Sequence, residues 1–252
     1  MLRRLPRPVT ISALVVVFVA MFSAVNLVYQ VAHKPTELLF PFDSTFDKTP
    51  AGTWRNYAPL FREYSTSTIT PELLAALAQV ESDGNPMART YWRWRLTWHP
   101  FAIYRPASSS IGLYQMTDAA FADARRYCIR DHAVVTDGCW LTGLYNRLLP
   151  SHAIELTAVF LDRAVAAILA RRAGAASPRQ LQALAALIHL CGAGPGEGFA
   201  RRGFHLAPGE RCGGEDAAAY LARVEAMKQQ FQRLAAVRHP DPRSSAPPKE
   251  PS

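Results

Sequence analysis

Apolar positions form one long stretch near the N-terminus and then recur with helical spacing through the rest of the chain. Residues 9–28 are 20 mostly apolar positions, and no charged residue occurs between Pro8 and Ala32. A helix rises about 1.5 Å per residue, so such a stretch matches the roughly 30 Å hydrocarbon core of a bilayer. We therefore expect a transmembrane helix at residues 9–32.

The residues around this stretch favour an uncleaved signal anchor. The alternative, a cleaved secretory signal, usually has a shorter apolar centre and a small-x-small cleavage site, to which residues 22–24 are a poor match. Arg3, Arg4 and Arg7 precede the apolar residues, and basic flanks remain on the cytoplasmic side. We expect a single-pass protein of the bacterial inner membrane, with residues 1–8 in the cytoplasm and the body in the periplasm.

The body has the periodicity and the start signals of helices. Thr70-Pro71 and Ser177-Pro178 each pair a hydroxyl N-cap with proline at the first helical position. No apolar–polar alternation typical of a strand persists beyond four or five positions. The sequence predicts an all-α fold, with helices at about residues 54–64, 70–84, 117–127, 150–173, 177–192 and 215–237.

The segments outside these helices set the expected domain limits. Residues 33–53 are rich in Pro, Thr, Phe and Asp without a helical period, so we expect a linker. Residues 54–237 form the expected domain, within which residues 128–148 are mostly connection. Residues 238–252 have too little apolar content to bury, which predicts a disordered tail.

Charge and cysteine content narrow the function. The net charge is +8, but the basic residues are scattered in short doublets rather than in a stripe with stacking aromatics, so no nucleic-acid partner is expected. Four cysteines in an exported chain indicate two disulfides. Of three possible pairings, we favour Cys128–Cys139 with Cys191–Cys212, which closes two local loops. Zinc is a weak alternative because no CxxC or HxxxH spacing occurs.

Glu81 is the strongest candidate for chemistry. It follows Leu77 by four residues and Leu74 by seven, so its carboxyl should point along the buried face in the last turn of its helix. Burial and the helix dipole both disfavour an ionised carboxylate there, as a general acid requires. On position alone, a glutamate at a fraying helix end is the alternative.

Three patches at helix ends place Glu81 in a larger pattern. They are residues 80–86 (VESDGNP), 108–117 (SSSIGLYQMT) and 185–196 (AALIHLCGAGPG). In this order they resemble the lytic transglycosylases with a soluble-transglycosylase (SLT) domain, which cleave peptidoglycan and have a lysozyme-like helical fold. The resemblance covers residues 54–237 and implies no metal or cofactor.

The resemblance assigns roles residue by residue. Glu81 matches the family's catalytic acid and base, and Ser82 its usual neighbour. Residues 112–115 match the Gly-Leu-Met-Gln motif, with Tyr114 in the methionine position and Gln115 expected to line the glycan cleft. Tyr220 matches a late tyrosine near the catalytic glutamate. The expected substrate-binding residues are Ser82, Tyr114, Gln115 and Tyr220, with Glu155 as a further candidate.

The chain also departs from the family pattern. Cys191-Gly192 stands where the family usually has Tyr-Asn, so a disulfide at Cys191 would fix that loop in place of the missing side chains. A longer interval between Glu81 and Gly112 carries Trp92, Trp94 and Trp98. These tryptophans either extend the sugar cleft or pack the insertion, and the sequence leaves both readings open.

The resemblance implies cleavage between N-acetylmuramic acid and N-acetylglucosamine by one carboxyl. Glu81 would protonate the leaving oxygen and then remove the proton of the muramyl 6-hydroxyl, giving an anhydro ring. Lysozyme-type hydrolysis usually needs a second carboxylate, and neither Asp83 nor Asp118 is a convincing one. Glu155 either reaches the cleft or lies on a solvated face, and His189 is expected in the core rather than in catalysis.

Two other functions remain open from the sequence. One is a hydrolase of the same fold that produces reducing ends. The other is a non-catalytic domain that binds glycan strands or scaffolds an envelope complex. The expected partners are peptidoglycan strands and the cytoplasmic membrane, and a cell-envelope secretion or division complex is a further candidate.

Overall fold

The computed structural model describes residues 7–34, 45–171 and 174–237. The expected tail at 238–252, residues 1–6 of the expected cytoplasmic segment and residues 35–44 of the expected linker lie outside this part of the chain. The described chain is mostly helical, as predicted.

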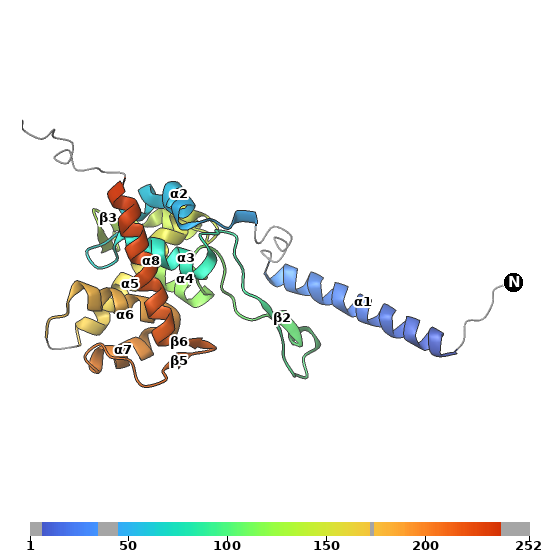
Figure 1. Cartoon of the computed structure of the whole chain (residues 1–252). Coiled ribbons are helices and arrows are strands. Elements are labelled where there is room, and N and C mark those ends of the chain that lie inside the picture. The colour runs from blue at the N-terminus through green and yellow to red at the C-terminus, as the bar shows by residue number, and fades with distance from the viewer. Residues whose placement is uncertain (1–6, 35–44, 172–173, 238–252) are drawn as a thin grey trace, which may run out of the picture.

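An apolar helix, α1 (Arg7–His33), projects away from the body (Figure 1). Its apolar side chains are exposed along most of its length, and it is long and apolar enough to cross a membrane. The structure therefore confirms the predicted apolar helix, from Arg7 rather than from residue 9.

The body is built around α3 (Pro71–Ser82), which packs between α2 (Pro50–Glu63) and α8 (Ala217–Val237). Figure 1 shows α8 crossing the face of the body over α3. The other helices are α4 (Asp118–Ala124), α5 (Pro150–Leu169), α6 (Pro178–Cys191) and α7 (Ala193–Arg201), with short 3-10 turns η2 (Pro100–Ala102) and η3 (Trp140–Leu144). Leu74 and Leu77 of α3 are fully buried, so this helix forms the centre of the core.

The predicted start signals are in place. Thr70 caps α3 by accepting from Leu73 N, and Ser177 caps α6 in a reciprocal capping box with Gln180. The predicted start of α2 is wrong, because this helix begins at Pro50 behind the cap Thr49. Residues 50–53 therefore belong to the body and not to a linker.

Several short elements of the structure were not expected from the sequence. The described residues contain three antiparallel pairs: β1–β2 (Trp92–Trp94 with Tyr104–Pro106), β3–β4 (Cys128–Arg130 with Ala133–Val135) and β5–β6 (Arg211–Cys212 with Glu215–Asp216). Strands of two or three residues are too short to show an alternating pattern. Helix α7 begins with Ala-Gly-Pro-Gly, a composition that indicates a turn rather than a helix.

Both disulfides have the sequential pairing. Cys128–Cys139 joins β3 to the residue before η3, and Cys191–Cys212 joins the end of α6 to β5. The second bridge therefore attaches a surface hairpin to the helix that carries the third sequence patch.

Candidate active site

The end of α3 is shaped by two residues in the left-handed backbone region. Asp83 has φ of 50° and Gly84 has φ of 66°. The backbone N–H of Gly84 donates to Ala78 O and that of Asp83 to Gln79 O, which completes the last turn. A Cβ at Gly84 would lie 2.1 Å from Thr53 Oγ1, so only glycine fits against α2. This termination fixes Glu81 in the last turn.

The segment that leads into α2, together with the first turn of α2, holds the same helix end. Lys48 N donates to Asp83 O (2.7 Å), and Lys48 Nζ donates to Gly84 O (3.1 Å). Gln79 Nε2 donates back to Lys48 O at 2.9 Å, and Thr53 Oγ1 donates to Gln79 Oε1 at 2.7 Å. We call residues 47–53 the N-terminal strap.

Glu81 meets side chains from two other helices. The Tyr220 hydroxyl of α8 donates to Glu81 Oε1 at 2.5 Å, and His189 Nε2 of α6 lies 3.5 Å from the same oxygen. The Glu81 side chain is 18% exposed. Both contacts therefore fall on the same carboxylate oxygen, Oε1.

The environment of Tyr220 keeps its hydroxyl protonated. The residue is 2% exposed. Burial, followed by the negative charge of Glu81 and the hydrogen bond to it, raises the pKa of Tyr220 well above its usual value. The phenol therefore remains a hydrogen-bond donor to Glu81 Oε1.

The second sequence patch is fixed directly against α3. Ser82 Oγ donates to Leu113 O at 2.8 Å, and the Tyr114 hydroxyl donates to Leu74 O at 3.1 Å. Gly112 has φ of 79°, and a Cβ there would lie 2.4 Å from Arg147 O. The glycine of this motif is thus required by a close backbone approach.

This arrangement corrects two predicted substrate contacts. Ser82 and Tyr114 are 8% and 1% exposed, and their hydroxyls bond to backbone carbonyls within the protein. They position the motif rather than face a ligand. Gln115 is half-buried with φ of 47°, and its Nε2 donates to Gly112 O at 3.1 Å.

Glu155 lies neither in a glycan cleft nor on a solvated face, the two positions considered from the sequence. It is 3% exposed, and it accepts from Ile129 N at 2.8 Å and from the Tyr145 hydroxyl at 2.6 Å. Both the glycan contact and the solvated face required an accessible carboxylate, so both readings are wrong. Glu155 instead ties α5 to β3 and to the residue that follows η3.

His189 is the site residue that sequence reasoning assigned to the core. Its side chain is 10% exposed, as a core residue would be, but it points to Glu81. The ring also meets the edge of Tyr114, with centroids 6.4 Å apart. The sequence contains one indication that His189 belongs to the site. The residue lies in the third patch, two residues before Cys191-Gly192, where the chain departs from the family pattern.

The other carboxylates near these patches are engaged elsewhere. Asp118 pairs with Arg147 at 2.5 Å and its side chain is 70% exposed. Asp83 is exposed beyond the helix end, and Glu215, which lies near Tyr220, is ion-paired with Arg223. Within the described residues, no group of three or more His, Cys, Asp or Glu side chains could hold a metal ion.

Part of this site lies in a segment that matches a known protein family. The model of the Transglycosylase SLT domain matches residues 59–186, just over half of the 252-residue chain. The chain belongs to the SLT transglycosylase domain family. Membership in the SLT family indicates glycan cleavage of the lytic transglycosylase or lysozyme-like type on peptidoglycan. No curated protein matches the chain.

The SLT match contains part of the site and not all of it. Glu81 and the 112–115 motif lie within residues 59–186. His189 and Tyr220 lie beyond the match, near the end of α6 and on α8. Tyr220 reaches Glu81 through the packing of α8 against α3, and His189 reaches it from α6. The strap also lies outside it, on the N-terminal side.

Proposed function

We propose that this protein is a membrane-anchored lytic transglycosylase that cleaves the β-1,4 bond between N-acetylmuramic acid and N-acetylglucosamine without water. The observation that carries the proposal is the single, partly exposed Glu81 carboxyl whose Oε1 accepts from the neutral Tyr220 hydroxyl. Glu81 acts first as the acid and then as the base.

In the first step, Glu81 Oε2 gives its proton to the glycosidic oxygen as the bond from that oxygen to muramyl C1 breaks. The N-acetylglucosamine leaves with a free hydroxyl. The substrate's own acetamido oxygen stabilises the positive charge at C1. Tyr220 donates throughout to Oε1, so it stabilises the carboxylate that this step produces.

In the second step, the Glu81 carboxylate removes the proton of the muramyl 6-hydroxyl. The 6-oxygen then bonds to C1 and closes a 1,6-anhydro ring. Glu81 ends the cycle protonated, as it began, so the cycle consumes no water and needs no second acid or base.

The surroundings of Glu81 support this route over hydrolysis. A retaining hydrolase places two carboxyl groups about 5–5.5 Å apart, and an inverting enzyme places them about 6.5–9.5 Å apart. Asp118 and Glu215 are each held in an ion pair with arginine. The groups recorded at the Glu81 carboxylate are a phenol and an imidazole.

Analysis of the products tests the reaction. Purified full-length protein in detergent is incubated with peptidoglycan, and the muropeptides are analysed by mass spectrometry before and after borohydride reduction. We expect muramyl ends that are lighter by one water than hydrolysis products and that resist reduction. Reducible muramyl ends would instead establish the hydrolase.

Tyr220→Phe is expected to lower turnover with little change in glycan affinity. Hydrogen bonds to charged groups contribute about 1.5–3 kcal/mol, which corresponds to a loss of roughly 10- to 150-fold in kcat. Tyr145→Phe is the matched control, because it removes a tyrosine-to-glutamate bond of 2.6 Å in another part of the fold. Steady-state rates of both variants, compared at equal folded fraction, check this. Equal kcat for the two variants would contradict the role of Tyr220.

We also propose that α1 anchors the enzyme in the inner membrane with the body in the periplasm. The apolar, exposed surface of α1 and the preceding basic residues support this orientation. The proposed limits are residues 1–8 in the cytoplasm, 9–32 in the membrane, and a catalytic domain that ends at 237 and begins with the strap.

A further inference from the structure

The insertion between Glu81 and Gly112 forms an exposed hairpin, residues 91–107, which we call the insertion hairpin. It contains β1 and β2, and Figure 1 shows it projecting from the body on the same side as α1. Trp94 is 73% exposed, and Leu96 and Trp98 are fully exposed. Trp92 and Trp94 pack against the Tyr104 ring within the insertion, with centroids 5.1 and 4.6 Å from it. Trp98 is fully exposed, so the packing reading from the sequence does not hold for Trp98.

The insertion hairpin is attached to the last turns of α1. Asn26 Nδ2 donates to Tyr104 O at 2.8 Å, and Gln30 Nε2 donates to Phe101 O at 2.6 Å. The rings of Tyr29 and Phe101 stack with centroids 4.4 Å apart. Asn26 and Gln30 are buried, although the apolar residues around them on α1 are exposed.

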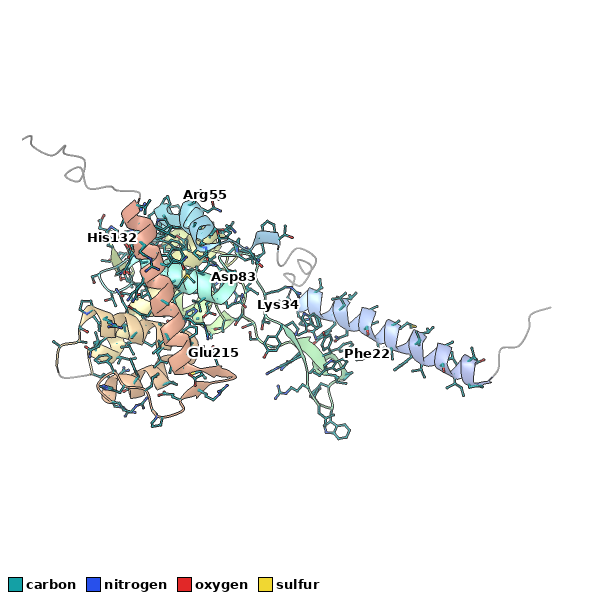
Figure 2. All side chains as sticks on the ribbon, viewed as in Figure 1. Phe22, Lys34, Arg55, Asp83, His132 and Glu215 are labelled. Atoms are coloured by element: carbon teal, nitrogen blue, oxygen red, sulfur yellow. A yellow bond between two sulfur atoms is a disulfide. The ribbon has the colours of Figure 1, made fainter. Side chains whose placement is uncertain are left out.

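A third contact fixes the direction of the hairpin. Lys34 Nζ donates to the carbonyls of Ser108 and Ser110, both at 3.3 Å. Figure 2 shows Lys34 at the end of α1 nearest the body. From Ser108 to Tyr104, the hairpin therefore runs back along α1, from the level of Lys34 to the level of Asn26.

This register sets the height of the tryptophans relative to a membrane. The apolar stretch of α1 ends at Val28, two residues beyond Asn26, and two residues of helix rise only about 3 Å. Trp94 is paired with Tyr104 across the hairpin, so it shares the level of Asn26. A bilayer whose hydrocarbon core lies along the apolar residues 9–28 of α1 would reach the level of Trp94.

The composition of the insertion hairpin is typical of segments at the boundary between lipid hydrocarbon and headgroups. Tryptophan and tyrosine concentrate at the boundary between hydrocarbon and headgroups, and arginine beside them can reach the phosphates. Arg93, Arg95 and Arg105 lie in the hairpin, and no Asp or Glu occurs between residues 84 and 117. The segment is therefore cationic, which favours contact with anionic headgroups.

We propose that the exposed face of the insertion hairpin, with Trp94, Leu96 and Trp98, lies in the outer interface of the membrane that α1 crosses. The ligand is the lipid surface itself. The inference rests on the proposed anchoring by α1 and adds a second membrane contact, made by the catalytic body. It excludes a role for these three side chains as a free extension of the glycan site.

Quenching of tryptophan fluorescence by lipid tests the proposal. The full-length protein is reconstituted into vesicles of phosphatidylglycerol and phosphatidylethanolamine, with or without a lipid brominated near the headgroup. Trp94→Phe/Trp98→Phe is compared with Trp140→Phe. Trp140 is the matched control because it is 80% exposed and follows Cys139, which is bonded to β3. Figure 1 shows β3 on the side of the body away from α1.

The proposal predicts strong quenching in the parent and in Trp140→Phe, and loss of most of it in Trp94→Phe/Trp98→Phe. Flotation of the same vesicles shows independently whether α1 anchors the protein in the membrane. Protein that floats with equal quenching in both variants would overturn the hairpin contact alone. Protein that does not float would overturn the anchor and the hairpin contact together. A fluorescence change at Trp94 and Trp98 on adding a chitin tetrasaccharide, without quenching by lipid, would assign the hairpin to glycan instead.

Discussion

Glu81→Gln is expected to abolish most peptidoglycan cleavage, with a loss of about 100- to 10,000-fold in turnover, the usual contribution of general acid–base catalysis. Glutamine has no proton to give to the leaving oxygen and no basic oxygen to accept one from the 6-hydroxyl. Its carbonyl oxygen can still accept from the Tyr220 hydroxyl, so the fold around the site should survive. Release of soluble muropeptides over time measures the loss.

Glu72→Gln is the control for this substitution, because Glu72 lies in the first turn of the same helix. It should retain the parent's rate and thermal midpoint. If Glu81→Gln releases muropeptides as fast as Glu72→Gln, Glu81 is not the catalyst. If neither the parent nor the two variants release muropeptides, the function is instead that of a domain that binds or scaffolds glycan strands.

Cys191→Ser/Cys212→Ser is expected to lower the free energy of unfolding by roughly 3 kcal/mol, because the bridge closes a loop and so restricts the unfolded chain. It should also lower turnover, because Cys191 is two residues from His189 and bonds α6 to the β5–β6 hairpin. Chemical denaturation and rates measured well below the unfolding transition separate the two effects.

Cys128→Ser/Cys139→Ser provides the comparison. That bridge closes a loop of 11 residues in sequence separation against 21 for the other, so the loss of stability should be similar. It joins β3 to the residue before η3, and neither cysteine contacts Glu81, so turnover of the folded protein should be retained. Equal losses of turnover in both double variants would show that the Cys191–Cys212 bridge has no special role in the site.

The helices could be predicted from the sequence because their signals are local. Thr70-Pro71 and Ser177-Pro178 set the first turn through bonds within three residues, and the structure has both caps. The early start of α2 was missed, since Pro50 and Gly52 indicate a break unless the cap Thr49 is recognised. The short strand pairs depend on partners across a turn and leave no periodic pattern.

The site was only partly predictable, because its members come from three helices. The position of Glu81 in the last turn of α3 follows from its own segment. The direction of His189 depends on how α6 meets α3, and the apolar residues beside it indicate only burial. Ser82, Tyr114 and Glu155 are polar residues in or near the motifs. The sequence does not reveal that each is buried and hydrogen-bonded to another part of the protein.

The N-terminal strap changes where the functional unit begins. The SLT family match starts at residue 59 and the helical period starts at 54, yet residues 47–53 hold the end of α3 through Lys48 and Thr53. A soluble fragment cut at either of those positions would free Gly84 and Gln79 and leave the Glu81 turn unsupported. The smallest autonomous enzyme is therefore longer at its N-terminal end than its family signature, and a fragment for biochemistry should begin no later than Asp47.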